Sequence, residues 1–215
     1  MRKEGITFDV VLDEGLTDLG KSVLPDPNLL DYYKRIRERE IFINEDVGDH
    51  IVDYVLQIFQ WNKEDKDINV ENRKKIKIFI NTNGGDTTAM NCMISAIEMS
   101  KTPCITIGMG KCFSAGAMML IAPKPENRYI LPSTIVMIHK GSSGIMSDVN
   151  KIINYSKFLE KDNELCKNYI LKNTKITPEK YKEVEDKDWY VFASECLDYG
   201  IVGNIIEDFD ELVNL

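Results

Sequence analysis

The sequence contains three residues whose types together carry out nucleophilic acyl transfer, namely Ser114, His139 and Asp188. A serine hydroxyl becomes a nucleophile when a base lies within hydrogen-bonding reach, and a carboxylate can orient that base. His139 is the plausible imidazole base, because the other histidine, His50, lies in the charged start of a predicted helix. Asp186 competes with Asp188 for the role of the carboxylate. Each residue alone has a simpler structural explanation, so the three predict a site only as a set.

The sequence around Ser114 suits a site that stabilises an oxyanion. Ser114 follows a predicted strand and starts a predicted helix, whose free N–H groups favour developing negative charge. The Gly84–Gly85 turn follows another predicted strand and can either aim a backbone N–H at a bound carbonyl or be only a tight turn. A phosphate-binding P-loop is disfavoured, because no Lys-Ser or Lys-Thr pair follows these glycines. Small neighbours would let a substrate backbone approach the serine: Gly110, Ala115, Gly116 and Ala117.

The chain order of the three residues is serine, histidine, aspartate. This order differs from those of the α/β-hydrolases, chymotrypsin and subtilisin. The segment CFSAG is also not a GxSxG nucleophile elbow, because Cys112 stands where the first glycine would be. These three protease classes are therefore poor matches.

The elements that must position these residues alternate between strands and helices. Apolar runs predict strands at 76–81 and 103–110, and a helix is predicted between them at 87–99. Two short strands around a Pro-Ser turn are predicted over 128–139. A long helix is predicted from an N-cap at Ser147 to about Lys172, and Pro178 suits the first position of another short helix. This alternation predicts an α/β fold with right-handed crossovers.

The N-terminal part is harder to interpret. FDVVL is a candidate strand, and LPDPN is a candidate turn or linker. A helix is predicted from Leu30 to Arg39, followed by a short strand, EIFIN, and a second helix from Asp49 to Trp61. The charged stretch over 62–75 is predicted to be a solvated loop.

The composition of the 215 residues excludes several classes of protein. A net charge of −8 argues against nucleic-acid binding and against adsorption to anionic membranes. No apolar run reaches the roughly 20 residues of a membrane span, and the N-terminus has no apolar core of a signal peptide. Five cysteines without a CxxC pair make disulfides and zinc sites unlikely. We therefore expect a cytoplasmic protein without a metal site.

Four segments of the sequence resemble the ClpP family, the proteolytic subunits of the Clp proteases. They are INTNGGDTTAMNCM, GKCFSAGAMMLIA, LPSTIVMIH and DWYVFASECLDYGIV. The intervals agree with the family without gaps: 29 positions from Gly85 to Ser114, 25 from Ser114 to His139 and 49 from His139 to Asp188. The resemblance covers about residues 31–207.

The resemblance implies a role for each matching residue. Ser114 would be the nucleophile, His139 the general base and Asp188 the residue that orients the imidazole. The backbone N–H groups of Gly85 and Ala115 would form the oxyanion hole.

The resemblance also selects the aspartate and divides the chain. Asp188 is preferred to Asp186 because it lies twelve residues before Gly200, as in the family pattern. Residues 31–215 would form a ClpP-like serine protease domain, and residues 1–30 an N-terminal segment with a possible axial or gating role.

The family's known properties give further expectations. The implied fold is the ClpP/crotonase type, an α/β fold of repeated ββα units with a protruding handle helix, here within 147–172. Family members form stacked heptameric rings that enclose their active sites and cleave unfolded polypeptides. An AAA+ unfoldase, which uses the ATP, feeds the chamber, so this subunit itself would need no cofactor.

The family's apolar docking surface for the unfoldase maps onto residues that are all apolar or aromatic here. The same residues could equally be ordinary core and rim residues. They are Phe79, Ile107, Met109, Tyr129, Leu131 and Ile206.

Some segments depart from the family pattern. Lys111, Cys112 and Phe113 replace small or neutral residues before the nucleophile, and the segment after His139 reads HKG instead of HQP. NGG replaces PGG, the loop around 62–75 is longer, and the N-terminus does not match the axial-loop pattern.

Two alternatives to a Clp-type endopeptidase remain open at this point. One is a catalytically silent ring subunit that regulates a catalytic paralogue, although such subunits usually lose members of the Ser-His-Asp set. The other is an acyl-CoA enzyme of the crotonase type, which also uses two backbone N–H groups for an oxyanion but needs no such set.

Overall fold

The computed structural model describes residues 27–141 and 143–215, with side chains from residue 31 onward. The candidate strand FDVVL and the first part of the predicted segment 1–30 lie outside the described residues. Helix α1 (Pro27–Glu38) begins three residues before the predicted start, with Pro27 in the first helical position, where its missing N–H costs nothing.

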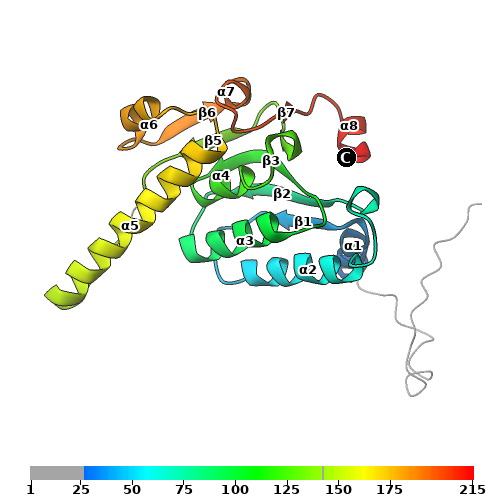
Figure 1. Cartoon of the computed structure of the whole chain (residues 1–215), viewed down its shortest axis with the longest axis horizontal. Coiled ribbons are helices and arrows are strands. Elements are labelled where there is room, and N and C mark those ends of the chain that lie inside the picture. Colours follow the sequence, from blue (N-terminus) through cyan, green and yellow to red (C-terminus); the bar gives the residue numbers. More distant parts are fainter. Residues whose placement is uncertain (1–26, 142) are drawn as a thin grey trace, which may run out of the picture. The chain divides into compact units, whose positions relative to one another are not determined.

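The chain divides into two units, one ending at Arg37 and one spanning Glu38–Leu215. All the candidate site residues belong to the second unit, which is built on a seven-stranded sheet (Figure 1). Five strands run parallel in the order β1, β2, β3, β4, β7. Their bounds are β1 (Glu40–Ile43), β2 (Ile76–Thr82), β3 (Cys104–Phe113), β4 (Arg128–Ile130) and β7 (Asn204–Ile205).

Strand β3 is long enough to pair with two different neighbours on one side. Its residues 106–108 pair with β4, and its residues 111–113 pair parallel with β5 (Ile135–Ile138). Strand β6 (Trp189–Phe192) then pairs antiparallel with β5. Most of β2 and β3 is buried, as their largely apolar sequences predict for parallel strands that are covered on both faces.

Helices connect the strands, which confirms the predicted α/β alternation. Helices α2 and α3 lie side by side in Figure 1, and Asp86 caps α3 by accepting a hydrogen bond from the backbone N–H of Ala89 at 2.8 Å. No helix in the described part of the chain is long and apolar enough to cross a membrane. The helices of the second unit are α2 (Ile51–Glu64), α3 (Thr87–Met99), α4 (Ala115–Leu120), α5 (Val149–Asn173), α6 (Pro178–Val184), α7 (Ala193–Asp198) and α8 (Phe209–Asn214), with 3₁₀ turns η2 (Val70–Asn72) and η3 (Pro125–Asn127).

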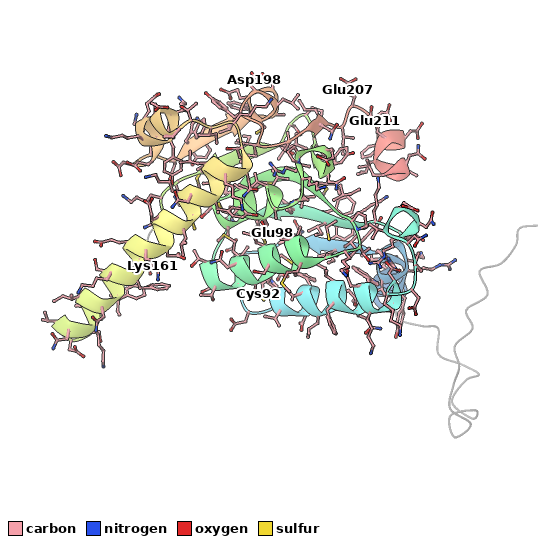
Figure 2. The ribbon with its side chains drawn as sticks, viewed as in Figure 1. Cys92, Glu98, Lys161, Asp198, Glu207 and Glu211 are labelled. Atoms are coloured by element: carbon pink, nitrogen blue, oxygen red, sulfur yellow. The ribbon has the colours of Figure 1, made fainter. Side chains whose placement is uncertain are left out.

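Helix α5 is the long helix that the sequence predicts, and its N-terminal part extends away from the sheet (Figure 1). Ile170 is its one buried residue, and Tyr169 ties this end to α3 by donating to Glu98 at 2.9 Å (Figure 2). The predicted N-cap, Ser147, is wrong by one position. Asp148 caps the helix instead, because its carboxylate accepts from the backbone N–H of Lys151 at 3.1 Å.

The prediction of a solvated loop over 62–75 is wrong in part. Helix α2 continues to Glu64, and the next residue, Asp65, is only 2% exposed. Its carboxylate accepts two hydrogen bonds from the Arg39 guanidinium, at 2.5 and 2.8 Å, and one from Thr102 Oγ1 at 2.8 Å. These hydrogen bonds, first that from Arg39, hold the pKa of Asp65 below its usual value although burial opposes them.

We expect the Asp65→Asn variant to be about 3 kcal/mol less stable at neutral pH. The Arg39 side chain is only 12% exposed, and in the variant its one remaining ion-pair partner would be Glu64, at 3.9 Å. The pKa of Asp65 is lower in the folded state than in the unfolded state. The ionised carboxylate therefore makes its full contribution to the free energy of unfolding at pH values well above the unfolded-state pKa of about 3.9. That contribution is lost as the pH falls through the folded-state pKa. The difference in unfolding free energy between parent and variant should therefore shrink in acid.

Urea unfolding at pH 7 and at about pH 3.5 measures this difference. Asp67→Asn is the matched control, since the Asp67 side chain is 87% exposed beside Lys66 and its removal should change little. Equal unfolding midpoints for the parent and the Asp65→Asn variant at pH 7 would contradict the prediction.

Candidate active site

Ser114 lies between the end of β3 and the start of α4, in a conformation that serine rarely adopts. Its φ is 53° and its ψ is −114°, and its backbone N–H donates to the carbonyl of Met137 at 2.8 Å. Such strain persists only where the surrounding structure enforces it, and it is often found at functional sites. The turn therefore holds the Ser114 side chain in a fixed direction at the edge of the sheet.

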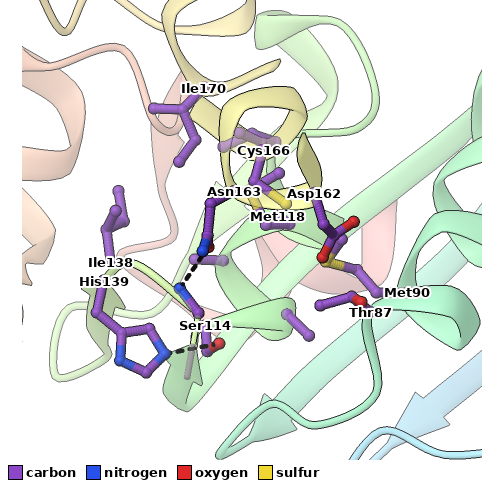
Figure 3. Close-up of a pocket in the computed structure, with 14 residues that line it drawn as sticks. Thr87, Met90, Ser114, Met118, Ile138, His139, Asp162, Asn163, Cys166 and Ile170 are labelled. Atoms are coloured by element: carbon purple, nitrogen blue, oxygen red, sulfur yellow. Dashed lines mark hydrogen bonds between the residues drawn. The ribbon is translucent and has the colours of Figure 1, made fainter. Parts of the chain in front are cut away.

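The order of strands β3, β5 and β6 brings the three candidate residues together. His139 directly follows β5, which pairs with the end of β3, and its Nε2 lies 2.9 Å from Ser114 Oγ (Figure 3). Asp188 directly precedes β6, whose Trp189 is paired with the last residue of β5. The Asp188 Oδ1 atom lies 3.1 Å from His139 Nδ1. The three side chains thus form a continuous hydrogen-bonded chain.

Asp186, the competing carboxylate, lies elsewhere. Its Oδ1 is 3.9 Å from the Nζ atom of Lys140, and this pair is exposed. The His139 side chain is 23% exposed and the Asp188 side chain 56%, so the chain of hydrogen bonds runs from a half-buried imidazole to an accessible carboxylate. Ser114 is itself partly exposed, so its side chain is not sealed inside the core.

The Gly84–Gly85 turn packs directly against the turn that holds Ser114. A Cβ on Gly84 would lie 2.8 Å from Ser114 Cβ and 3.1 Å from the backbone nitrogen of Ala115. Val47 donates to the carbonyl of Gly84 and accepts from the N–H of Asp86, each at 2.8 Å. These two hydrogen bonds form a parallel β-bridge between Val47 and Gly85, and the N–H of Gly85 itself takes no part in them. The N–H of Ala115 is likewise free of intrahelical partners, because Ala115 starts α4.

The unusual residues before the nucleophile have identifiable contacts. Lys111 Nζ donates to Asn83 Oδ1 at 2.8 Å. This hydrogen bond joins the two segments that depart from the family pattern, the NGG turn and the residues before Ser114. Phe113 packs edge-to-face against Tyr190, with ring centroids 5.7 Å apart. Burial raises the pKa of the Cys112 thiol to about 12. Cys112 is therefore a packing residue and not a second nucleophile.

A small cavity of about 40 Å³ lies beside Ser114, between α3, α4 and α5 (Figure 3). Its walls are largely apolar, and Asn163 of α5 accepts a hydrogen bond from the backbone N–H of Gly141 at 2.9 Å. This bond ties the segment after His139 to α5. Neither Asn163 nor the cavity was predicted from the sequence. The one available signal was that residues 163, 166 and 170 share a face of the predicted long helix.

The six predicted docking residues lie together on another part of the sheet. Phe79, Ile107 and Ile206 are buried in one apolar cluster with Ile105. The other three pack against that cluster and are partly buried: Met109, Tyr129 and Leu131. The C-terminal residues Leu212 and Leu215 also contact it. The described residues contain no group of three or more metal-ligating side chains.

The chain is similar to known proteins along most of its length. The family model described as Clp protease matches residues 26–209. The ATP-dependent Clp protease proteolytic subunit 2 of Treponema pallidum is 32% identical over 134 residues, which make up 62% of this chain and 67% of that protein. The ATP-dependent Clp protease proteolytic subunit of Dehalococcoides mccartyi is 25% identical over 177 residues, or 82% of this chain and 86% of that protein.

A solved structure of a ClpP1 mutant from Listeria monocytogenes is similar over most of the chain. The TM-score is 0.72 and the sequence identity 28%, and the match covers 84% of this chain and 98% of that chain. The predicted ClpP-type fold, with α5 in the place of the handle helix, is therefore confirmed.

Proposed function

We propose that this chain, which belongs to the Clp protease family, is a serine endopeptidase that cleaves unfolded polypeptides through an acyl-enzyme intermediate. The observation that carries the proposal is the hydrogen-bonded chain from Ser114 to His139 at 2.9 Å and from His139 to Asp188 at 3.1 Å. A nucleophile within reach of a base, and a base held by a carboxylate, is the arrangement that serine hydrolysis requires.

In the proposed reaction, Ser114 Oγ attacks the carbonyl carbon of the peptide bond while His139 Nε2 accepts its proton. Asp188 holds the other ring nitrogen and stabilises the imidazolium that forms. The N–H groups of Gly85 and Ala115 donate to the oxyanion. His139 then gives the proton to the leaving amine, and a water molecule, deprotonated by the same imidazole, hydrolyses the acyl-enzyme.

We also propose that the chain works as part of a larger assembly. By analogy with its family, we expect stacked heptameric rings around a chamber and an AAA+ unfoldase that consumes ATP. The apolar cluster that holds the six predicted docking residues supports a docked partner, since Met109, Tyr129 and Leu131 keep part of their surface accessible. The five cysteines are free thiols, which supports a reducing compartment such as the cytoplasm.

The proposed function is tested by treating the assembled full-length protein with a fluorophosphonate, a reagent that phosphonylates activated serines. We expect one adduct per chain, located on Ser114 by peptide mass spectrometry, together with loss of hydrolysis of fluorogenic peptides. The Ser114→Ala variant is the control and should form no adduct. An assembled protein that forms no adduct and cleaves no peptide would instead fit the catalytically silent ring subunit.

A further inference from the structure

The cavity beside Ser114 is the place where a substrate side chain would be accommodated. In the proposed reaction the attacked carbonyl carbon must come within about 3.5 Å of Ser114 Oγ. The side chain on the N-terminal side of the cleaved bond is attached one atom away from that carbon. This side chain, the P1 side chain, would therefore lie next to the cavity that Ser114, His139, Met90, Met118 and Ile170 line (Figure 3).

Asp162 gives this cavity a charge. It is one of the fourteen lining residues, and apart from the titratable His139 it alone among them carries a formal charge at neutral pH. Figure 3 shows its side chain extending from α5 toward Met90 and Thr87 at the start of α3. The described residues provide no hydrogen bond or ion pair to its carboxylate. Asp162 is partly exposed, so water can solvate its carboxylate while the cavity is empty. An occupant that displaces this water must replace its hydrogen bonds, which favours a cationic occupant.

The structural roles that a carboxylate could have at this place are already filled. The start of α3 is capped by Asp86, whose carboxylate accepts from Ala89, so Asp162 is not needed there. The cations of α5 nearest in sequence are engaged or exposed, since Lys167 pairs with Glu164 at 3.4 Å and Lys161 is exposed (Figure 2). Asp162 therefore has no partner among the residues that the structure describes in the second unit.

The negative charge of Asp162 acts on another residue that lines the cavity, Cys166. Burial, followed by the negative charge of Asp162, raises the pKa of the Cys166 thiol, one helical turn further along α5, to about 11. Cys166 therefore stays a neutral wall residue, and the field of Asp162 extends over the space that a substrate side chain would occupy.

We propose that Asp162 selects a lysine or arginine side chain at P1, so that this protease cleaves after basic residues. The inference rests on the proposed function, because it assigns a substrate class to the same site. The apolar stem of a basic side chain would pack between Met90, Met118 and Ile170, and its cationic end would meet the Asp162 carboxylate. The cavity of about 40 Å³ admits such a side chain only if the methionines move. Thioether side chains have three rotatable bonds and adapt their shape readily.

The test compares fluorogenic peptides that differ only at P1, which is Lys, Leu or Glu, with the assembled full-length protein. We expect the parent to favour Lys over Leu in kcat/KM. Asp162→Asn should lower the ratio of kcat/KM for the Lys peptide to that for the Leu peptide by about 10- to 100-fold, the value of one charge-assisted hydrogen bond. Asp162→Lys should favour the Glu peptide. The matched control is Glu160→Gln, which removes a carboxylate from the exposed face of the same helix and should alter no preference.

The outcomes separate this inference from the proposed function. Peptidyl phosphonates with the same P1 side chains report the preference through the rate at which they modify Ser114, even if turnover is slow. A parent that prefers Leu, or an Asp162→Asn variant with an unchanged ratio of Lys to Leu, overturns the selection by Asp162 while the protease remains. If no peptide is cleaved and no phosphonate modifies Ser114, the proposed function fails and this inference fails with it.

Discussion

Replacing Ser114 by alanine or by glycine is expected to lower kcat for peptide hydrolysis by about 10⁵- to 10⁶-fold, but only the glycine variant should gain stability from relaxation of the backbone. Both variants remove the oxygen that lies 2.9 Å from His139 Nε2. They therefore lose the same nucleophile and the same hydrogen bond. The two differ only in the methyl group at a position with φ of 53° and ψ of −114°.

The expected stability difference follows from that backbone conformation. A side chain in such a region costs on the order of 1–3 kcal/mol, and glycine avoids most of this strain. Glycine also loses more entropy on folding, by up to about 1 kcal/mol relative to alanine, so we expect a net advantage of about 1 kcal/mol for Ser114→Gly over Ser114→Ala. Urea unfolding of the two variants at equal protein concentration measures this difference. An alanine variant that keeps kcat within about tenfold of the parent would show that Ser114 is not the nucleophile.

The parts of the fold that could be predicted from the sequence are those in which one local pattern determines the outcome. Strands β2 and β3 were predictable because largely apolar segments of this length suit a parallel strand that is buried on both faces. Helix α3 was predictable from its place between two strands, and helix α5 from its long apolar stripe and the capping residues near its start. The N-cap of α5 was misplaced because Ser147 and Asp148 are equally suitable caps and only the backbone geometry distinguishes them.

The candidate site residues Ser114, His139 and Asp188 could be predicted together, although none of them could be assigned on its own. The intervals between Ser114, His139 and Asp188 carry the prediction, and the structure supplies the reason for them. The three residues lie at the ends of β3, β5 and β6, and these strands are neighbours in the sheet. The elements between them return the chain to the point where the three strand ends meet.

The features that escaped prediction are contacts between charged residues and distant elements. Asp65 was assigned to a solvated loop because charged residues are usually exposed, but its partner, Arg39, lies 26 positions earlier. Arg128 is 1% exposed and donates to the carbonyls of Pro123 and Asn173, each at 2.6 Å. Burial lowers its pKa to about 10. No local pattern distinguishes these residues from surface charges, because their environment is formed only when the chain folds.

Replacing Gly85 by alanine is expected to lower kcat by about 10²- to 10³-fold, the usual loss for one oxyanion donor. The φ of Gly85 is 147°, and an added Cβ would lie 2.2 Å from the carbonyl oxygen of Val47. The backbone must therefore shift, and the N–H that we propose as an oxyanion donor shifts with it. The hydrogen bond between Ser114 and His139 does not involve Gly85, so the loss should arise in the stabilisation of the transition state and not in the nucleophile itself.

Steady-state kinetics on a fluorogenic peptide measures the effect, after circular dichroism has shown that the variant is folded. Gly48→Ala is the matched control, because Gly48 follows Val47 directly and an added Cβ there would meet only His50, at 3.6 Å or more. That control should keep kcat close to the parent value. A folded Gly85→Ala variant with the kcat of the parent would mean that the oxyanion is stabilised without the N–H of Gly85, and the donor pair would then have to be sought within the first turn of α4 alone.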